Sequence, residues 1–360
     1  MKRYILYFFI CLISILLFSF KSNEITRTNS QDQDTLIYPG EKHFKNLRML
    51  TSEGNDNAEA YFSNDGTKII FQSTRGPYEC DQIYMMNIDG SNVHMVNSGK
   101  GRTTCAYFFP DDEHILYAST HLGGDFCPPK PDHSMGYVWP IFDTYDIFVG
   151  NIDGANLKNL TNIKGYDAEA TVSPIGDRII FTSTRNGDID IYSMKLDGSD
   201  VKQLTDIAGY DGGANYSYDG KMIVWRAMRP KEGDEMNDYK DLLSKNLVKP
   251  SALEIYVMNA DGSNKIQVTS NGKANFGPYF LPDNKRIVFC SNMDDPERRN
   301  FDLYIINVDG SGLERITYYE QFDGFPMFSL NDGGKKFIFC SNRFGLKPHQ
   351  SNVFLCDWVE

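Results

Sequence analysis

The chain has 360 residues, of which 41% are hydrophobic, 13% aromatic and 23% charged. This is the composition of a folded protein with a large core and not of a disordered chain. The 36 Lys and Arg against 48 Asp and Glu give a formal net charge of -12. Since no basic stripe offsets that charge, the composition argues against a nucleic-acid-binding protein. The 30 Gly, 15 Pro, 24 Phe and 21 Tyr favour many short strands joined by tight turns.

The N-terminus has the pattern of an export signal. Lys2 and Arg3 precede an apolar run over residues 4–20, after which the chain turns polar. No pair of small residues marks a cleavage site at the end of this run, so an uncleaved N-terminal anchor is an open alternative. We predict a signal peptide or anchor over residues 1–20, a polar linker over 21–42 and a folded domain over 43–360. The domain is expected in the periplasm or outside the cell.

The domain repeats one unit six times. An aromatic and β-branched phrase ending in Asp-Gly recurs as DQIYMMNIDG, YDIFVGNIDG, IDIYSMKLDG, LEIYVMNADG and FDLYIINVDG. The step from Asp153 to Asp197 gives a basic period of 44 residues. A second phrase alternates with the first, beginning with YFSNDGTKIIFQSTR and ending with MFSLNDGGKKFIFCSNR. Each phrase reads as strand, tight turn and strand, so each unit predicts two hairpins and four strands.

A period of 40–50 residues with four strands per repeat predicts a ring of blades. We therefore expect an all-β, six-bladed β-propeller of four-stranded antiparallel blades. The sixth unit lacks an outer strand, whereas HFKNLRMLT at residues 43–51 resembles the outer-strand phrases LKNLT, VKQLT and LERIT. This N-terminal segment should complete the last blade and close the ring, which removes a free sheet edge.

The pattern F-S-x-D-G-x-x-I-x-F-x-S-x-R followed by I-Y-x-M-N-x-D-G resembles the TolB-like propeller repeats of exported bacterial proteins over residues 43–360. The resemblance implies the fold more than the function, because such blades occur in colicin-translocation TolB, in peptidase-associated propellers and in oligogalacturonate lyase-like enzymes. We expect no α/β domain before the propeller. The sequence contains no Gly-x-Ser-x-Gly elbow, and its six His do not recur at equivalent blade positions.

Alignment of the units places acidic and basic residues in two columns at the same end of each first hairpin. This predicts three cross-strand pairs: Asp167 with Arg185, Asp211 with Arg229, and Asp323 with Arg343. One interpretation is a structural pair in each blade. The other is that the rim presents these groups to a polar ligand. The Asp-Gly pairs are interpreted as turn residues and not as calcium loops, since alternate oxygen ligands are absent from the repeats.

Two insertions, at about residues 121–143 and 230–252, are expected to rise from one face of the ring and to wall a groove over the third blade. Leu242, Leu243, Leu247 and Val248 follow an acidic start at helical spacing and predict a short helix. The candidate ligand-binding residues of this groove are His121, Tyr137, Trp139, Tyr166, Asp167, Glu169, Arg185, Tyr210, Asp211, Arg226 and Arg229.

Aromatic rings beside carboxylates and Arg suit a carbohydrate or a peptide. We expect a binding or scaffold module for an oligosaccharide, a peptide or an envelope protein, with no cofactor and no metal, and with membrane contact only through the N-terminal segment. The alternative is a carbohydrate-active enzyme, in which Glu169 with Asp167, or Glu59 with Asp56, would act as acid and base. In a third possibility, a large protein partner covers the face.

Six Cys lie outside the export segment, and an exported chain permits disulfides. Cys80 with Cys127, or Cys105 with Cys127, would tie down the first insertion. Cys290 and Cys340 occupy equivalent strand positions and are expected to be buried thiols. A zinc site of three Cys with His121 or His133 matches no ligand spacing.

Overall fold

The computed structural model of the protein describes residues 33–360 except residues 133, 135 and 298. The predicted signal or anchor and most of the predicted linker lie outside the described residues. No helix in the described part of the chain has the length and apolarity needed to cross a bilayer.

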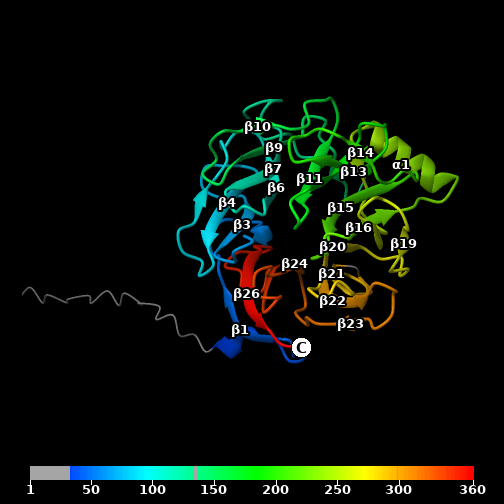
Figure 1. The fold of residues 1–360 in the computed structure, drawn as a ribbon. Coiled ribbons are helices and arrows are strands. Elements are labelled where there is room, and N and C mark those ends of the chain that lie inside the picture. The colour runs from blue at the N-terminus through cyan, green and yellow to red at the C-terminus, as the bar shows by residue number, and fades with distance from the viewer. Residues whose placement is uncertain (1–32, 133, 135, 298) are drawn as a thin grey trace, which may run out of the picture. The chain divides into compact units, whose positions relative to one another are not determined.

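The described chain is the predicted six-bladed propeller, with four-stranded antiparallel sheets following one another around a ring (Figure 1). Strands run outward from the axis in chain order in blades 1 to 5. Blade 1 contains β2 (Ala58–Phe62), β3 (Lys68–Ser73), β4 (Gln82–Asn87) and β5 (His94–Met95). Blade 2 contains β6 (Thr103–Phe108), β7 (His114–Ser119), β9 (Asp146–Asn151) and β10 (Lys158–Asn159). Blade 3 contains β11 (Asp167–Val172), β12 (Arg178–Ser183), β13 (Asp190–Lys195) and β14 (Lys202–Gln203).

The remaining three blades continue the ring. Blade 4 contains β15 (Tyr210–Tyr216), β16 (Met222–Met228), β18 (Glu254–Asn259) and β19 (Ile266–Gln267). Blade 5 contains β20 (Asn275–Phe280), β21 (Arg286–Ser291), β22 (Asp302–Asn307) and β23 (Glu314–Arg315). Blade 6 contains β24 (Asp323–Phe328), β25 (Lys336–Ser341), β26 (Asn352–Trp358) and, as its outer strand, β1 (Phe44–Met49).

The core of the ring lies between neighbouring blades. The second strand of every blade carries one aromatic residue at the same position, each at most 2% exposed: Phe71, Tyr117, Phe181, Trp225, Phe289 and Phe339. A single blade has no cover for such rings, so each face is buried only when the next blade packs on it. The Asp-Gly turns behave as predicted, since Asp89, for example, accepts hydrogen bonds from the backbone N–H and the hydroxyl of Ser91.

The ring closes as expected, because β1 pairs antiparallel with β26, with Phe44 opposite Trp358 and Arg48 opposite Leu355. The end of the predicted linker is folded onto this blade: residues Gln33–Leu36 form a 3-10 helix, η1, and Glu41 is buried.

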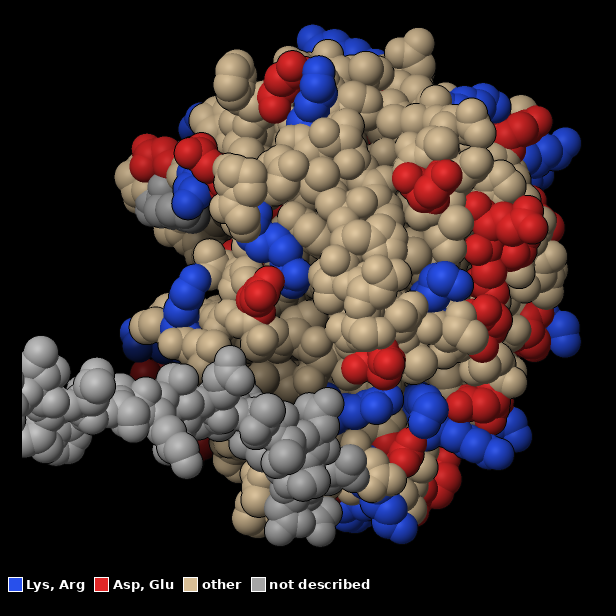
Figure 2. Space-filling model, turned by 90° about the vertical axis from the view of Figure 1, so that its left-hand side faces the viewer, with Lys and Arg blue, Asp and Glu red and all other residues tan. Residues whose placement is uncertain are grey.

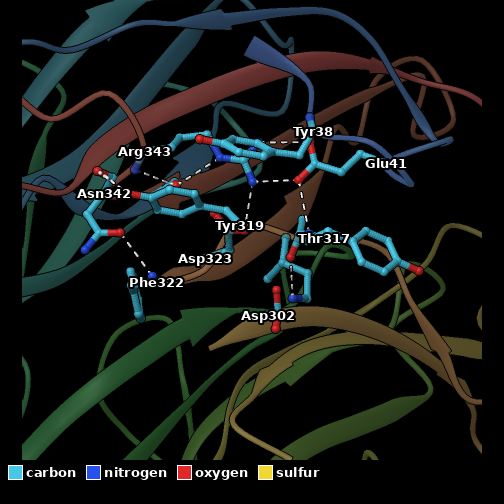
Figure 3. A network of polar contacts seen from close by, with 12 residues as sticks. Tyr38, Glu41, Asp302, Thr317, Tyr319, Phe322, Asp323, Asn342 and Arg343 are labelled. Carbon is cyan, nitrogen blue, oxygen red and sulfur yellow. Dashed lines mark hydrogen bonds and ion pairs between the residues drawn. The ribbon is translucent and has the colours of Figure 1, made fainter. Parts of the chain in front are cut away.

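An ion network fastens the closing segment (Figure 3). The Arg343 guanidinium donates to the Glu41 carboxylate at 2.8 and 3.0 Å and to Asp323 at 2.8 Å. All three side chains are 0% exposed. The rings of Tyr38 and Tyr319 lie 5.2 and 5.6 Å from the guanidinium. The predicted pairing of Asp323 with Arg343 is present, and Glu41 adds a second anion from the N-terminal segment.

The two insertions pair with each other. Strand β8 (Trp139–Pro140) of the first insertion and β17 (Leu247–Val248) of the second form a separate two-stranded sheet. The predicted helix is present as α1 (Asp234–Ser244) and buries Met236, Tyr239 and Leu242. Leu247 and Val248 lie beyond the helix in β17, which corrects their predicted helical place. The first insertion is tied down by the disulfide Cys80–Cys127, one of the two predicted pairings.

We expect Glu41→Ala to destabilise the protein by about 3 kcal/mol, because it leaves the buried Arg343 guanidinium with one anion in place of two. Urea unfolding monitored by circular dichroism measures this free energy. The matched control is Asp241→Ala, which removes an exposed ion pair with Lys245 on α1 and should change stability by less than about 1 kcal/mol. Equal effects of the two substitutions would contradict a clasping role for Glu41.

Candidate functional site

A cavity of about 700 Å³ opens at the centre of the ring on the face that carries both insertions. Its floor comes from the innermost strands, and its roof from Trp139 and Pro140 of β8, the strand that pairs with β17. Lys249 and Pro250, which follow β17, also line it. The insertions therefore cover the axis of the propeller, which differs from the predicted groove over blade 3 alone.

The side chains at the floor are set by a repeated backbone irregularity. Each innermost strand pairs with its neighbour in shifted register around one residue with a positive φ. These bulge residues are Glu59 (φ 49°), Cys105 (53°), Glu169 (53°), Gly213 (60°), Gly277 (52°) and Phe325 (53°). A left-handed conformation costs a non-glycine residue roughly 1–2 kcal/mol. Such strained positions cluster at functional sites, which makes this ring of residues the first place to look for one.

Glu169 is held in a fixed, fully bonded position. Its carboxylate forms an ion pair with Arg226 of β16 and accepts hydrogen bonds from the Thr182 hydroxyl at 2.9 Å and from the Gly213 N–H at 3.0 Å. The Tyr210 hydroxyl lies 3.2 Å from the same carboxylate and accepts a bond from Arg226 at 2.9 Å. The group is a preorganised cluster of one anion, one cation and one phenol on the cavity floor.

Two glycines make room for this cluster. A Cβ at Gly213 would overlap the Arg226 guanidinium, and a Cβ at Gly212 would overlap the Tyr210 hydroxyl and the Glu169 carboxylate. Blade 3 has Ala168 and Glu169 at these two positions. The Gly-Gly step of blade 4 is therefore what allows Arg226 to lie over the bulge and reach Glu169.

Glu59 occupies the same bulge position in blade 1 but has a different environment. Burial raises its pKa to about 7, against the opposing hydrogen bond from the Cys105 thiol. Burial also raises the pKa of Cys105 well above its usual value, and the neighbouring carboxylates Glu59 and Glu169 add to that effect. The thiol is thus a neutral donor, and a Cys nucleophile at this position is disfavoured.

Aromatic rings form much of the cavity wall. Trp139 of the roof packs 5.3 Å from Phe276, and the Arg226 guanidinium lies 5.4 Å from the Trp139 ring and 5.8 Å from Phe276. Tyr137, in the first insertion, is 68% exposed. The other aromatic residues of the lining are Phe142, Tyr145, Tyr166, Tyr210, Phe301, Phe322 and Phe325.

Two tyrosines of the innermost strands bridge the ring. The hydroxyls of Tyr107 and Tyr279, from blades 2 and 5, lie 3.1 Å apart and hydrogen-bond to each other. Both residues are buried. Because blades 2 and 5 are opposite each other in the ring, this bridge runs across the axis. A separate space of about 30 Å³ is lined by all six bulge residues.

Six of the eleven predicted ligand-binding residues come together in this cavity: Tyr137, Trp139, Tyr166, Glu169, Tyr210 and Arg226. The other five lie outside its lining. Asp167 is buried and pairs with Arg185 at 3.0 Å, and Asp211 is buried and pairs with Arg229 at 2.7 Å. His121 packs 4.4 Å from Phe148 and bonds to Ser119.

Each predicted acid–base pair has only one member in the cavity lining. Glu59 and Glu169 reach the cavity, whereas Asp56 and Asp167 are absent from its lining. Sequence reasoning missed Cys105, Phe276, Phe301, Phe322, Phe325, Arg102, Lys249 and Arg299. One available signal was the phrase Ala-Glu-Ala, which occurs at equivalent places only in blades 1 and 3.

The described residues contain no group of three or more His, Cys, Asp and Glu placed to hold a metal ion. On the face in Figure 2, Lys and Arg are interspersed with Asp and Glu, and acidic side chains gather along its right-hand edge.

Comparison with known proteins confirms the TolB-like propeller fold. Residues 142–246 match the TolB beta propeller domain family. The chain is 31% identical over 94 residues to an uncharacterized protein of Agrobacterium fabrum. That match covers 26% of this chain and 30% of the relative's own length, so it spans less than a third of that protein.

Two solved structures extend the similarity over most of the chain. A putative TolB from Agrobacterium tumefaciens has a TM-score of 0.58 and 17% identity, over 87% of this chain and 94% of that one. TolB from Acinetobacter baumannii has a TM-score of 0.56 and 18% identity, over 82% of this chain and 64% of that one. At these identities the likeness establishes the fold.

Gly213→Ala should lower the free energy of unfolding more than Gly272→Ala, the same change at a position with free space around it. Both Gly213 (φ 60°) and Gly272 (φ 64°) have left-handed backbones, but an added Cβ at Gly272 meets nothing within 4 Å. We expect Gly272→Ala to cost about 1 kcal/mol for the backbone alone. Gly213→Ala should cost a further 1–3 kcal/mol, roughly, because it displaces Arg226. Urea unfolding of both variants measures the difference, and equal costs would refute the steric role of Gly213.

Glu59→Gln should stabilise the protein more at pH 8 than at pH 5. The pKa of Glu59 is raised on folding, so the native state loses stability relative to the unfolded state as pH rises from about 4.5 to about 7. Removal of this ionisation should recover up to about 3 kcal/mol at pH 8. Unfolding free energies at the two pH values test this, with Glu113→Gln on an exposed turn as the control. A pH-independent effect of Glu59→Gln would contradict the raised pKa.

Proposed function

We propose that this TolB-like propeller is an exported binding protein whose roofed central cavity takes a compact ligand with ring-sized groups, such as the end of an oligosaccharide or a short peptide. The observation that carries the proposal is the central cavity of about 700 Å³ with aromatic walls and a small number of fixed polar groups on its floor. Small-molecule sites in proteins share this size and this lining.

The chemistry of the lining supports a ligand with flat faces and polar edges. Aromatic faces such as those of Trp139 and Tyr166 can stack on a sugar or a side-chain ring. The Arg226–Glu169–Tyr210 cluster offers charged donors and acceptors whose positions are already fixed, so little ordering is required on binding. The paired insertions occupy the centre of the face, which favours a small ligand over a protein inserted into the ring.

Two features support export. The N-terminal sequence has the charge and hydropathy pattern of a secretory signal. The Cys80–Cys127 disulfide is typical of an oxidising compartment. A periplasmic or extracellular location, with or without an N-terminal anchor, is therefore part of the proposal.

A second candidate is a carbohydrate-active enzyme. It is favoured by one observation: two carboxyl groups, Glu59 and Glu169, line the same cavity in unlike environments. The first has a pKa of about 7, and the second is ion-paired with Arg226. Pairs of this kind divide acid and base roles in glycoside chemistry. Turnover of an oligosaccharide that is lost in Glu169→Gln, in a variant that remains folded, would favour the enzyme over the binding protein.

Ligand binding should change the fluorescence of Trp139. Of the three Trp, Trp139 lines the cavity, Trp225 is fully buried, and Trp358 lies in blade 6. We expect a saturable fluorescence change and a raised melting temperature when the full-length protein is titrated with members of an oligosaccharide and peptide panel. Trp139→Phe should remove the fluorescence signal while it keeps an aromatic wall and the thermal shift.

The control for this experiment is His121→Ala, which lies outside the cavity and should leave both signals intact. A thermal shift that survives Arg226→Lys and Trp139→Ala together, or one that is lost in His121→Ala, would place the ligand elsewhere. No response to any small ligand, with capture of an envelope protein instead, would favour the third possibility, a protein-docking surface.

A further inference from the structure

Glu59 and Glu169 are equivalent in position but not in bonding. Both are bulge residues with positive φ, in β2 and β11, and both line the cavity. Glu169 has a cation, a phenol, a hydroxyl and a backbone N–H as partners. Among the residues that the structure describes, the side-chain donor beside Glu59 is the weak Cys105 thiol. The floor of the cavity thus has one satisfied carboxylate and one that lacks a strong partner.

Among the described residues, the cations that line the cavity with Glu59 are Arg102, Arg226, Lys249 and Arg299, and none of them forms an ion pair with Glu59. The titratable and charged groups that interact electrostatically with Glu59 lie on its own strand and on other strands and loops of the ring. They are Tyr61, Asp81, Cys105, Tyr145, Glu169, Arg226 and Cys340. Arg226 is the single cation in this set, and its guanidinium is bonded to Glu169 and Tyr210. Ionisation of Glu59 would therefore leave the floor with one excess negative charge.

The cavity around Glu59 is suited to a positive charge. Arg102, which also lines the cavity, is paired with Asp81. Tyr145, Phe322 and Phe325 line the same space, and aromatic faces attract cations in sites shielded from water. An ammonium group is small enough to approach Glu59 and can donate the hydrogen bonds that this carboxylate lacks.

We propose that Glu59 is the anchor for the ammonium group of a ligand, so that the cavity takes a molecule that carries a protonated amine on a ring or on a short chain. An amino sugar and the amino terminus of a peptide share this chemistry. The inference rests on the proposed function, because it assigns a ligand class to the same cavity. Arg226 and Glu169 then form hydrogen bonds with the polar edge of the ligand, while Glu59 makes the cavity prefer a positively charged ligand.

The assignment links binding to a proton. The carboxyl of Glu59, with its pKa of about 7 in the free protein, is only partly ionised at neutral pH. An ammonium group favours the ionised form, so binding releases a proton from Glu59. The affinity for a permanently protonated amine should fall about tenfold from pH 8 to pH 6, following the ionised share of a group with this pKa.

Matched pairs of probes test the inference in the full-length protein. Tyramine has a ring and a primary ammonium that stays protonated over this pH range, and N-acetyltyramine is its neutral counterpart. Titration by Trp139 fluorescence and calorimetry should give at least tenfold tighter binding of tyramine than of N-acetyltyramine at pH 8. At pH 6, where Glu59 is mostly protonated in the free protein, tyramine binding should release a proton, which calorimetry detects in buffers of different ionisation enthalpy. Glu59→Gln should remove this preference and the pH dependence, whereas Glu113→Gln on an exposed turn should retain both.

Two further pairs separate the possible sources of the amine. Phe-Gly amide and its N-acetyl form report a peptide amino terminus, and the glucosamine dimer of chitosan and its acetylated form, N,N′-diacetylchitobiose, report an amino sugar. The natural class should show the greater preference for its free amine.

The outcomes distinguish the two proposals. Equal binding of amine and acetylated probes, or an amine preference unchanged in Glu59→Gln, would overturn the role of Glu59 and leave the cavity as a ligand site. Absence of binding by every probe at millimolar concentration would count against both. A folded Glu59→Gln protein that still binds the neutral probes shows that a lost amine preference is not a loss of structure.

Discussion

The left-handed bulge in the innermost strand of each blade is the constraint on which the central site depends. In a regular strand, successive side chains alternate between the two faces of the sheet. The bulge interrupts this alternation, and in this protein it places one residue per blade on the wall of the axial space. Four of the six bulge residues have a side chain despite the cost of the conformation. The ring scaffold thereby converts a local backbone irregularity into a converging set of functional groups.

The site is asymmetric although the scaffold repeats. Blades 1, 2 and 3 contribute Glu59, Cys105 and Glu169, while blade 4 has Gly213 and sends Arg226 across it. Polar chemistry is thus concentrated on one arc of the ring. The opposite arc contributes apolar contacts such as Phe276 and Phe325. A ligand in this space would meet a polar side and an aromatic side, which gives a symmetric fold a directional pocket.

Much of the fold follows from local sequence rules. The Asp-Gly hairpins, the outer strand over residues 43–51, the helix in the second insertion and the Asp–Arg pairs all depend on short patterns or on repeat alignment, and the structure contains each of them. The predicted pairs form, and Asp167 and Asp211 are buried against Arg185 and Arg229, which is the arrangement expected of a structural pair in each blade.

The centre of the site was less predictable, for two physical reasons. A bulge depends on pairing between strands, and Glu59 or Cys105 has no local feature that marks it as left-handed. The pairing of Trp139 and Val248 joins segments more than a hundred residues apart, and only the closed ring brings them together. Of the six predicted residues that line the cavity, Tyr137 and Trp139 come from the first insertion, whereas Glu169, Tyr210 and Arg226 lie in inner strands and Tyr166 directly precedes one.

The closure of blade 6 has a consequence for the order in which the molecule is made. Strand β1 and Glu41 lie near the start of the propeller, but their partners, β26 and Arg343, are among its last residues. During synthesis from the N-terminus, β1 has no partner until the final strand emerges. Contacts of such long sequence separation form slowly. Until then the incomplete ring presents unpaired strand edges, so assembly of the site is a late event that depends on arrival of the whole chain.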